Sequence, residues 1–351
     1  MKTQWMIYGA NGYSAQLAAK KAVELGLRPI LAGRNKEAIE AVANPLSLES
    51  RIFNLDDVNA ISGQLKDIKV LSHCAGPFSA TALAMMKACI ESGTHYTDIT
   101  GEIEVFDSAQ QLDLAAKQKK IVLCSGVGFD VIPTDCLANY LSSKMPDATD
   151  LTMGFHGNMS LSPGTAKTMV ESLSEGMKVR RDGKLKTVGR GFEMRTIDYG
   201  KGKRLSAVIP WGDLSTAFWQ TGIPNISIYT PFNKSKLAVY LFPLIKLVMK
   251  LKLLQKFVKN KIDKNVIGPS EKMRQQGDTF VWGEVKNKNS ETLAARIQVP
   301  NGYTVTMDGI IITAQFLLNY KGKGGCFTPS QLMGKELIHH LPDASEFKIV
   351  G

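Results

Sequence analysis

Residues 5–15 are Trp-Met-Ile-Tyr-Gly-Ala-Asn-Gly-Tyr-Ser-Ala, an apolar run that stops at Gly9 and is followed by Gly12 and Ala15. Beyond it, small and apolar residues recur at helical spacing as far as Gly26, namely Leu17, Ala18, Ala22, Val23 and Leu25. This pattern predicts a strand, a tight glycine turn and a helix, the order that a dinucleotide-binding fold requires. An ordinary strand-to-helix turn is the alternative, and the flanking strand and helix weigh against it.

Each small residue of this turn has its own physical task. Gly9 lets the chain turn sharply, Gly12 leaves room for a pyrophosphate, and Ala15 lets the helix pack closely on the strand. The common fingerprint differs in that its first two glycines are closer together and its third small residue is glycine. The first N–H groups of the helix have no internal partner and attract an anion. We expect five residues of the turn to contact the cofactor: Gly9, Asn11, Gly12, Tyr13 and Ser14.

The second expected strand, residues 29–33, ends in Arg34-Asn35. In NAD-binding folds this strand usually ends in an acidic residue that binds the ribose 2′-hydroxyl, whereas an arginine suits the 2′-phosphate of NADP. The guanidinium of Arg34 offers a fixed fork of donors for that phosphate. We therefore expect NADP as the cofactor, bound in part by Arg34 and Asn35. A plain surface arginine is the alternative, but no acidic residue takes the opposite role.

Strands and helices alternate over roughly the first 140 residues. Residues 70–75 are apolar enough for a strand that is buried on both faces. Ala75, Gly76 and Pro77 follow at its carboxyl end, where open α/β sheets bind ligands, so we expect them near the nicotinamide ribose. The alternation predicts an α/β protein with a Rossmann-type, doubly wound parallel sheet.

Ionisable side chains gather at the end of the fifth expected strand, in His95-Tyr96-Thr97-Asp98-Ile99-Thr100-Gly101-Glu102. A side chain at this edge of the sheet can supply the proton that some reductions need. Asp98 and Glu102 are our main catalytic candidates. His95, Tyr96 and Asp130 are the secondary ones. Alternatively, both carboxylates bond backbone N–H groups and only shape the loop, and water supplies the proton.

The composition is that of a globular protein of two domains, with 351 residues of which 44% are hydrophobic and 21% charged. No signal-peptide pattern precedes the first strand. Five widely spaced cysteines without a CxxC pair predict free thiols in a reducing compartment. The five histidines show no zinc spacing, so we expect no metal site. We expect a cytoplasmic protein.

The net charge of +11 is concentrated in one segment. Residues 1–150 carry 14 Lys and Arg against 17 Asp and Glu, whereas residues 234–264 carry nine Lys against one Asp. This distribution argues against a nucleic-acid binder, whose basic residues line a reading element. Residues 236–261 are too interrupted by Lys to span a membrane. They predict a basic amphipathic helix that contacts the inner face of an anionic membrane or a lipid-like substrate, or else packs on the core or on a second subunit.

After residue 150 the pattern becomes less regular and predicts an α+β domain. We expect residues 1–150 to bind NADP, residues 151–320 to form a substrate and dimerisation domain, and residues 321–351 to return to the first domain. The substrate of such proteins usually lies near the nicotinamide, between domains. The clearest local patterns of the second domain are a helix over 165–180, a hairpin of 279–285 with 292–299, and an apolar helix over 304–319.

Several motifs, taken in order along the chain, resemble the saccharopine dehydrogenase-like family of NADP-binding oxidoreductases. They are Gly9-Ala10-Asn11-Gly12-Tyr13, Ala32-Gly33-Arg34, Ala75-Gly76-Pro77-Phe78, the stretch from His95 to Glu102, Gly128-Phe129-Asp130, Gly164-Thr165-Ala166, Trp211-Gly212-Asp213, Thr221-Gly222-Ile223-Pro224-Asn225 and Gly324-Gly325-Cys326-Phe327-Thr328-Pro329. The resemblance covers nearly the whole chain and rests on the order of the motifs. It is closest to short bacterial members, some of them named trans-acting enoyl reductases.

The resemblance implies hydride transfer between NADP and a small or lipid-linked substrate that has a carbonyl, imine or enoyl group, in a homodimer. Saccharopine is a doubtful substrate, because the catalytic set of the lysine-pathway enzymes is not found here. The alternatives are a non-catalytic NADP-binding redox sensor, a membrane-associated accessory protein, and a subunit that works with a partner enzyme. An ionisable cleft around Asp98, Glu102 and Asp130 favours the enzyme, and an apolar one favours the sensor.

Overall fold

The computed structural model describes residues 2–157, 162–167, 170, 176–188, 193–232, 252–266, 268–275 and 277–350. The chain divides into two compact units, and each is built from two separate stretches. The first unit comprises Met1–Ile132 and Gly302–Leu341, and the second comprises Pro133–Asn301 and Pro342–Gly351.

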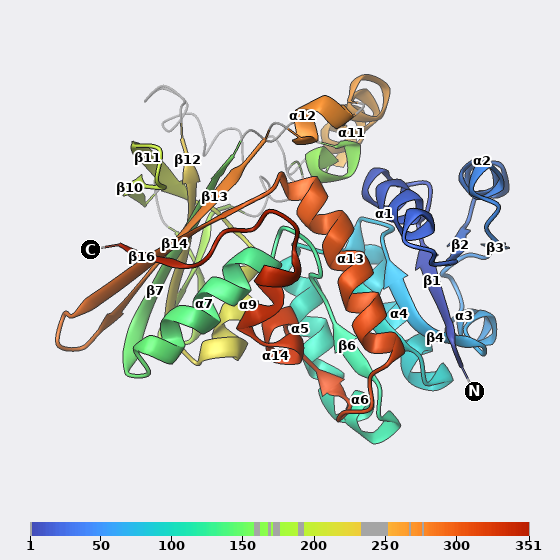
Figure 1. The fold of residues 1–351 in the computed structure, drawn as a ribbon, viewed down its shortest axis with the longest axis horizontal. Coiled ribbons are helices and arrows are strands. Elements are labelled where there is room, and N and C mark those ends of the chain that lie inside the picture. The colour runs from blue at the N-terminus through green and yellow to red at the C-terminus, as the bar shows by residue number, and fades with distance from the viewer. Residues whose placement is uncertain are drawn as a thin grey trace. The chain divides into compact units, whose positions relative to one another are not determined.

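The first unit is an α/β domain around a seven-stranded sheet (Figure 1). Its strands are β1 (Gln4–Tyr8), β2 (Ile30–Gly33), β3 (Ser50–Ile52), β4 (Ile68–His73), β5 (His95–Asp98), β6 (Val122–Cys124) and β15 (Gly325–Cys326). They lie in the order β15-β6-β5-β4-β1-β2-β3, and every neighbouring pair is parallel. Apart from β15 this is the Rossmann order, so the predicted doubly wound parallel sheet is confirmed.

Helices cover both faces of this sheet, and each face has its own apolar core. The helical elements are α1 (Tyr13–Glu24), α2 (Lys36–Ala43), η1 (Asn44–Leu46), α3 (Val58–Gln64), α4 (Phe78–Ser92), α5 (Ile103–Gln111), α6 (Asp113–Lys119), α13 (Gly302–Leu318), α14 (Pro329–Met333) and η2 (Lys335–His340). Side chains of α1, α2 and α13 belong to one core, which includes Ala18, Ile39 and Ala314. Side chains of α3 to α6 belong to the other, which includes Ile61 and Met85.

Helix α13 is the main reason why the two units differ from the domain boundaries expected at residues 150 and 320. We expected residues 304–319 in the second domain, but Ile310 and Leu317 pack with α1 in the first unit. After Leu341 the chain returns to the second unit, where β16 (Lys348–Val350) pairs with β14 (Thr292–Val299). The apolar pattern of a helix does not show which of two cores the helix packs on. The spacing of residues 304–319 therefore could not assign them to the first unit.

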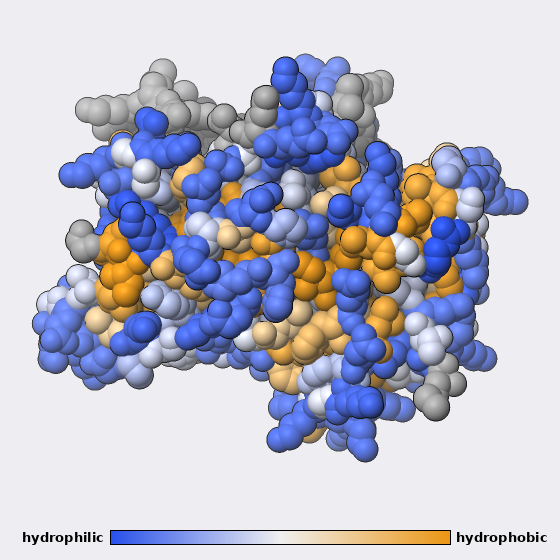
Figure 2. Space-filling view, viewed as in Figure 1, coloured by the Kyte–Doolittle hydropathy of each residue, from blue (hydrophilic) through white to orange (hydrophobic). Residues whose placement is uncertain are grey.

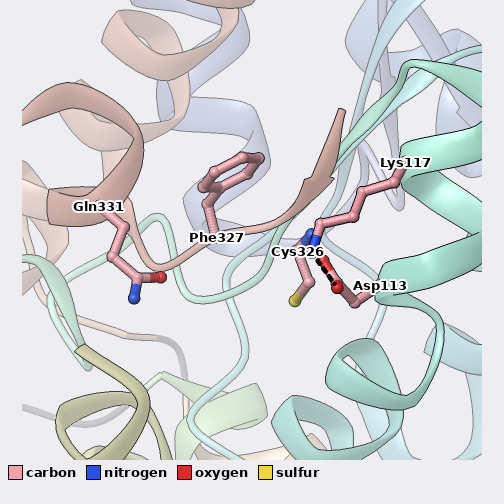
Figure 3. A pocket seen from close by; sticks show the side chains of 5 residues that line it. All are labelled: Asp113, Lys117, Cys326, Phe327 and Gln331. Carbon is pink, nitrogen blue, oxygen red and sulfur yellow. Dashed lines mark hydrogen bonds and ion pairs between the residues drawn. The ribbon is translucent and has the colours of Figure 1, made fainter. Parts of the chain in front are cut away.

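The edge strand β15 is protected against further strand pairing. Its Gly325 N–H donates to the carbonyl of Ile121, the residue before β6, while the N–H of Cys326 donates to the Asp113 carboxylate at 2.9 Å. Asp113 also pairs with Lys117 at 2.6 Å. These side chains line a small pocket with Phe327 and Gln331 (Figure 3). Because the Asp113 carboxylate already accepts the N–H of Cys326, this edge is a poor template for another strand.

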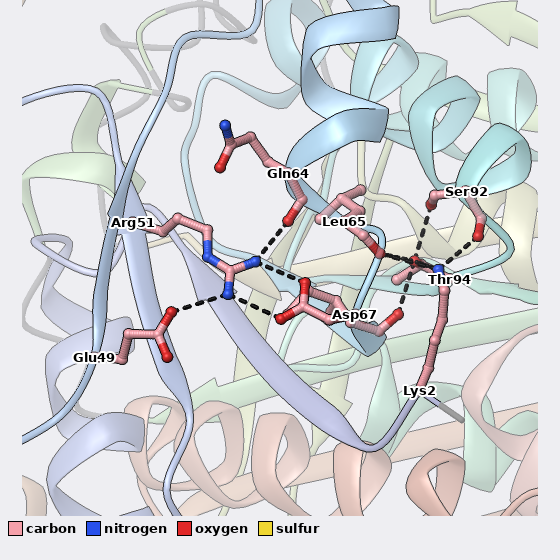
Figure 4. A network of polar contacts seen from close by, with 9 residues as sticks. Lys2, Glu49, Arg51, Gln64, Leu65, Asp67, Ser92 and Thr94 are labelled. Atoms are coloured by element: carbon pink, nitrogen blue, oxygen red, sulfur yellow. Dashed lines mark hydrogen bonds and ion pairs between the residues drawn. The ribbon is translucent and has the colours of Figure 1, made fainter.

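The opposite edge strand, β3, carries a charged network of its own. The guanidinium of Arg51 binds the carboxylates of Glu49 and Asp67 and the carbonyl of Gln64 (Figure 4). These bonds connect the edge strand to the end of α3. A short, charged edge strand also discourages pairing with another chain.

Lys2, near the start of the chain, forms hydrogen bonds with the C-terminal ends of two helices. Its ammonium group donates to the carbonyls of Leu65 and Ser92 and to the Thr94 hydroxyl (Figure 4). Leu65 follows α3 and Ser92 ends α4, so the cation lies where the helix dipole favours positive charge. Burial lowers the pKa of Lys2.

The second unit is built on a mixed nine-stranded sheet, so the predicted α+β domain is confirmed. Its strands are β7 (Ala148–Gly157), β8 (Lys178–Arg181), β9 (Lys184–Thr187), β10 (Met194–Asp198), β11 (Lys203–Val208), β12 (Asn225–Pro231), β13 (Thr279–Asn287), β14 and β16. The main path is β10-β11-β12-β7-β13-β14-β16, and β12 is parallel to β7. The helices are α7 (Ile132–Lys144), α9 (Asp213–Thr221), α11 (Lys252–Asn265) and α12 (Glu271–Gln275). The hairpin of β13 and β14 confirms the predicted one.

Two local features of the second unit differ from what the sequence indicated. The helix expected over 165–180 does not reach its predicted end, because β8 occupies Lys178–Arg181. Helix α9 was not expected, since its apolar residues are few and Gly212 and Gly222 flank it. The predicted free state of all five cysteines is confirmed.

Within the described ranges, no helix combines the length and apolarity needed to cross a membrane. On the face drawn in Figure 2, hydrophilic residues are spread over much of the surface, with apolar residues between them. Residues 236–251 of the expected basic amphipathic helix lie outside the described residues. The remainder belongs to α11, where the Phe257 side chain is 65% exposed.

Candidate functional site

Strand β1 marks the point where the strand order reverses, with β2 on one side and β4 on the other. In an open α/β sheet, ligands bind here, outside the carboxyl ends of the strands. The loops after β1 and β4 meet at this point. A Cβ on Gly9 would lie 2.7 Å from both the Cβ and the N of Ala75, and Gly9 has a φ of +81°. Glycine at position 9 therefore permits both the turn and the close approach of the two loops.

The turn continues into α1 as predicted. Gly12 is the N-cap residue, and its N–H donates to the Gly9 carbonyl at 2.9 Å. In this described helix no side chain caps the N-terminus, and the first turn has no acidic residue. Ala15 is fully buried in the core beneath the helix, and Asn11 is exposed. The N-terminus of α1 thus keeps the positive character that attracts a phosphate.

Tyr13 and Ser14, the first two residues of α1, are half-buried. The Tyr13 ring meets the ring of Tyr303 edge to face, with centroids 5.0 Å apart. Tyr303 is the second residue of α13, so this helix contributes to the surroundings of the glycine turn. Sequence reasoning missed Tyr303, because it placed α13 in the other domain.

The N-terminus of α4 differs from that of α1, because a carboxylate already occupies it. Glu102 accepts hydrogen bonds from the N–H groups of Phe78 at 3.0 Å and Ser79 at 2.7 Å. Gly76 and Pro77, just before this helix, are exposed. Of the two helices that follow β1 and β4, only α1 therefore offers its N–H groups to an anion. This distinction agrees with the pyrophosphate position expected at Gly9 to Ser14.

Arg34 follows β2 and is exposed. Among the described residues it has no hydrogen bond or ion pair, so its guanidinium can take a ligand phosphate. Asn35 instead caps α2 by accepting the N–H of Ala38 at 2.9 Å.

Sequence reasoning missed Tyr8, at the end of β1, whose hydroxyl donates to the Phe53 carbonyl at 2.9 Å. Burial raises the pKa of Tyr8 to about 12, and the charge of Arg34 acts in the opposite direction.

Asp98 lies at the carboxyl end of β5, fully buried within a set of four donors. The N–H groups of Thr100 and Gly126 donate to one carboxylate oxygen at 3.0 and 2.9 Å. The hydroxyls of Tyr96 and Ser125 donate to the other at 2.8 and 2.9 Å. Burial raises the pKa of Asp98, and the four donors work against that rise. The carboxylate therefore ties the end of β5 to the loop that follows β6.

Asp130 lies near the same edge of the sheet, in the loop after β6. Its Oδ2 would be 2.7 Å from a Cβ on Gly101, which places the carboxyl directly against the residue before Glu102. Burial raises the pKa of Asp130 to about 7. The N–H of the preceding residue, Phe129, donates to the Thr306 hydroxyl of α13 at 3.1 Å.

The contacts of His95 indicate a structural role and not proton transfer. Its Nδ1 accepts the backbone N–H of Val122 at 3.0 Å, and its ring meets Tyr320 edge to face. Burial lowers the pKa of His95 to about 4, with the charges of Lys69 and Lys2 acting in the same direction. The imidazole is therefore neutral at pH 7 and serves to connect β5 with β6.

The family model for the saccharopine dehydrogenase NADP binding domain matches residues 5–124. This stretch, about a third of the chain, is therefore similar to the NADP-binding domains of that family. The matched range runs from β1 to β6, and it includes the Gly9 turn, Arg34 and the loop after β4. The predicted NADP-binding domain and the expected cofactor agree with this assignment.

Curated relatives are about a quarter identical to this chain over the stretches that align. A human saccharopine dehydrogenase-like oxidoreductase is 25% identical in an alignment of 202 residues, which covers 50% of this chain and 47% of that protein. A trans-acting enoyl reductase of Mycobacterium bovis (strain BCG / Pasteur 1173P2) is 27% identical in an alignment of 187 residues, which covers 48% of this chain and 44% of that protein. The matches thus cover about half of this chain and less than half of each relative.

The structural similarity to known proteins covers more of this chain than the sequence similarity does. Saccharopine dehydrogenase (L-Glu forming) from Saccharomyces cerevisiae matches 99% of this chain and 100% of its own, with a TM-score of 0.66 and 13% sequence identity. Both the NADP-binding domain and the second, mixed-sheet domain therefore have counterparts in that structure. At this identity the likeness concerns the fold and not the substrate.

Proposed function

We propose that this chain is an NADP-dependent oxidoreductase that transfers a hydride between the nicotinamide and a small or lipid-linked substrate with a C=O, C=N or C=C bond. The observation that carries the proposal is the uncapped N-terminus of α1 at the Gly9–Ala75 contact, with Arg34 exposed after the adjacent strand. The cofactor carries the hydride chemistry, and the protein orients it. The name of the Mycobacterium bovis relative favours reduction and makes enoyl thioesters the first substrates to test. A homodimer remains part of this proposal.

We infer that Asp98 and Glu102 position the site instead of transferring protons. Each already accepts hydrogen bonds from inside the protein, Asp98 from four donors and Glu102 from the start of α4. Asp130 fits proton transfer better, because a carboxyl with a pKa of about 7 can both hold and release a proton at neutral pH. For an enoyl substrate, water can supply the proton equally well.

Arg34→Gln tests the cofactor assignment. We expect the variant to bind NADPH about 10 to 100 times more weakly, because charge-assisted hydrogen bonds to the 2′-phosphate contribute about 1.5–3 kcal/mol. NADH binding should change less than twofold, since NADH lacks that phosphate. The measurement is titration of nicotinamide fluorescence with each nucleotide.

Arg28→Gln is the matched control, because Arg28 precedes the same strand, is exposed and leaves the same net charge when replaced. We expect it to bind both nucleotides like the wild type. Equal loss of NADPH and NADH affinity in Arg34→Gln would contradict the 2′-phosphate assignment. Turnover of NADPH with enoyl thioesters then distinguishes an enzyme from the alternative, a redox sensor that binds NADPH without oxidising it.

We also propose that the basic segment 236–261 makes peripheral contact with an anionic membrane, or with a lipid-linked substrate carried by one. Phe257→Asp should reduce co-flotation with vesicles that contain phosphatidylserine, because it places a negative charge on an exposed apolar position of α11. Leu114→Asp is the control, since Leu114 is 67% exposed on α6 of the NADP-binding domain. Wild-type protein that fails to float with anionic vesicles at low salt would overturn the membrane contact.

A further inference from the structure

A hydroxyl of α4 returns to the loop from which that helix starts. The Oγ1 of Thr81, in the first turn of α4, lies 2.8 Å from the carbonyl oxygen of Ala75 and 3.1 Å from that of Pro77. The same oxygen lies 2.9 Å from Nε2 of His73, the last residue of β4. One hydroxyl thus connects the end of the strand with the two carbonyls of the loop after it.

Counting protons gives the direction of these bonds. A hydroxyl carries one proton, and so does a neutral imidazole. His73 is fully buried, and burial lowers its pKa to about 3, so the ring is neutral at pH 7. Its Nδ1 has no partner among the described residues. Because a buried acceptor without a partner is tolerated more often than a buried N–H, the proton belongs on Nε2. His73 therefore donates to Thr81, and Thr81 donates to Ala75.

The loop between β4 and α4 is consequently held from two sides. Thr81 donates to the carbonyl of Ala75, and Glu102 accepts the N–H groups of Phe78 and Ser79. Ala75 is also the residue whose Cβ and N lie against Gly9. The position of this loop therefore sets the spacing beside the glycine turn, where the cofactor is expected.

We propose that Thr81, oriented by His73, is a positioning residue for NADP. It fixes the Ala75 carbonyl and thereby the distance between the loops after β1 and β4. This inference rests on the proposed function, because the spacing matters to a nucleotide only if the nucleotide binds at the reversal point of the sheet. The hydroxyl itself touches neither cofactor nor substrate in this role.

Three variants separate positioning from general stability. Thr81→Val removes the hydroxyl at nearly constant shape, and Thr81→Ser retains it. Thr97→Val removes a buried hydroxyl from β5 that bonds the Leu71 carbonyl and the Ser72 hydroxyl, away from the loop. The readouts are the Kd for NADPH from nicotinamide fluorescence and the midpoint of urea unfolding.

We expect Thr81→Val to weaken NADPH binding about tenfold, consistent with the net contribution of a hydrogen bond, and Thr81→Ser and Thr97→Val to stay within twofold of the wild type. Equal NADPH affinity in wild type and Thr81→Val would overturn the inference and leave the proposed function intact. Equal weakening by Thr97→Val would also overturn it, because only general stability would then be involved. A wild type that binds no NADPH would overturn the proposed function and this inference together.

Discussion

Gly9→Ala should weaken NADPH binding by about a hundredfold, which corresponds to roughly 3 kcal/mol. The new methyl group would lie 2.7 Å from the Cβ and N of Ala75, a distance that two such atoms do not adopt. The backbone of Ala75 cannot turn away as a flexible side chain can, so the loops after β1 and β4 must separate. Alanine is also strained at a φ of +81°. Fluorescence titration with NADPH measures the loss.

Gly26→Ala is the matched control for Gly9→Ala. Gly26 follows the other end of α1 and has a φ of +77°, but an added Cβ there would meet no atom within 4 Å. We expect it to lower the free energy of unfolding by about 1–2 kcal/mol through backbone strain alone. Its NADPH affinity should equal that of the wild type. A similar loss of affinity in both variants would show that strain, and not the contact of the two loops, is responsible.

Asp98→Ala should lower the free energy of unfolding by about 3–5 kcal/mol, because each buried donor left without an acceptor costs about 1–3 kcal/mol. The hydroxyls of Tyr96 and Ser125 can rotate toward other acceptors, but the N–H groups of Thr100 and Gly126 cannot. Asp98→Asn should be milder, because its amide oxygen can keep both N–H groups while the hydroxyls accept from its NH₂. Urea unfolding of the three proteins tests this order.

Asp57→Ala provides the comparison for a carboxylate at the surface. Asp57 is exposed and caps α3 by accepting one N–H, that of Asn59, at 2.9 Å. Loss of such a cap costs about 1 kcal/mol. If Asp98→Ala costs no more than Asp57→Ala, the four-donor site does not organise the end of β5.

The first domain was largely predictable because its signals are local. Each strand is a short apolar run that stops at a glycine or a polar residue, as at Gly9, Gly33 and Gly76. The glycine turn and Arg34 are recognisable for the same reason: their tasks follow from the residue type and its place after a strand. The expected strands therefore match the observed ones to within a few residues.

The rest depended on contacts between distant residues. Sequence spacing places Asp98 and Glu102 at or after the end of a strand, but it does not show their distant donors. Several of these donors, such as Phe78 and Gly126, lie more than 20 positions away. Thr81 offered one local signal, because it stands one helical turn after Pro77 and can bond its carbonyl. Nothing local assigns α13 to the first core, since its pattern is apolar on nearly every side.

The interleaving of the two chain stretches has a consequence for synthesis. When Ile132 leaves the ribosome, six strands of the first sheet exist, but α13, which covers β1, β4 and β5, has not been made. At about 5–20 residues per second, the nascent chain waits on the order of 10–30 s for that helix. During this interval α1 and α2 already pack on that face, but the part that α13 covers lacks its helix. A fragment that stops after β6 would lack it permanently, so an isolated cofactor domain calls for a linker that joins residues 302–341 directly to Ile132.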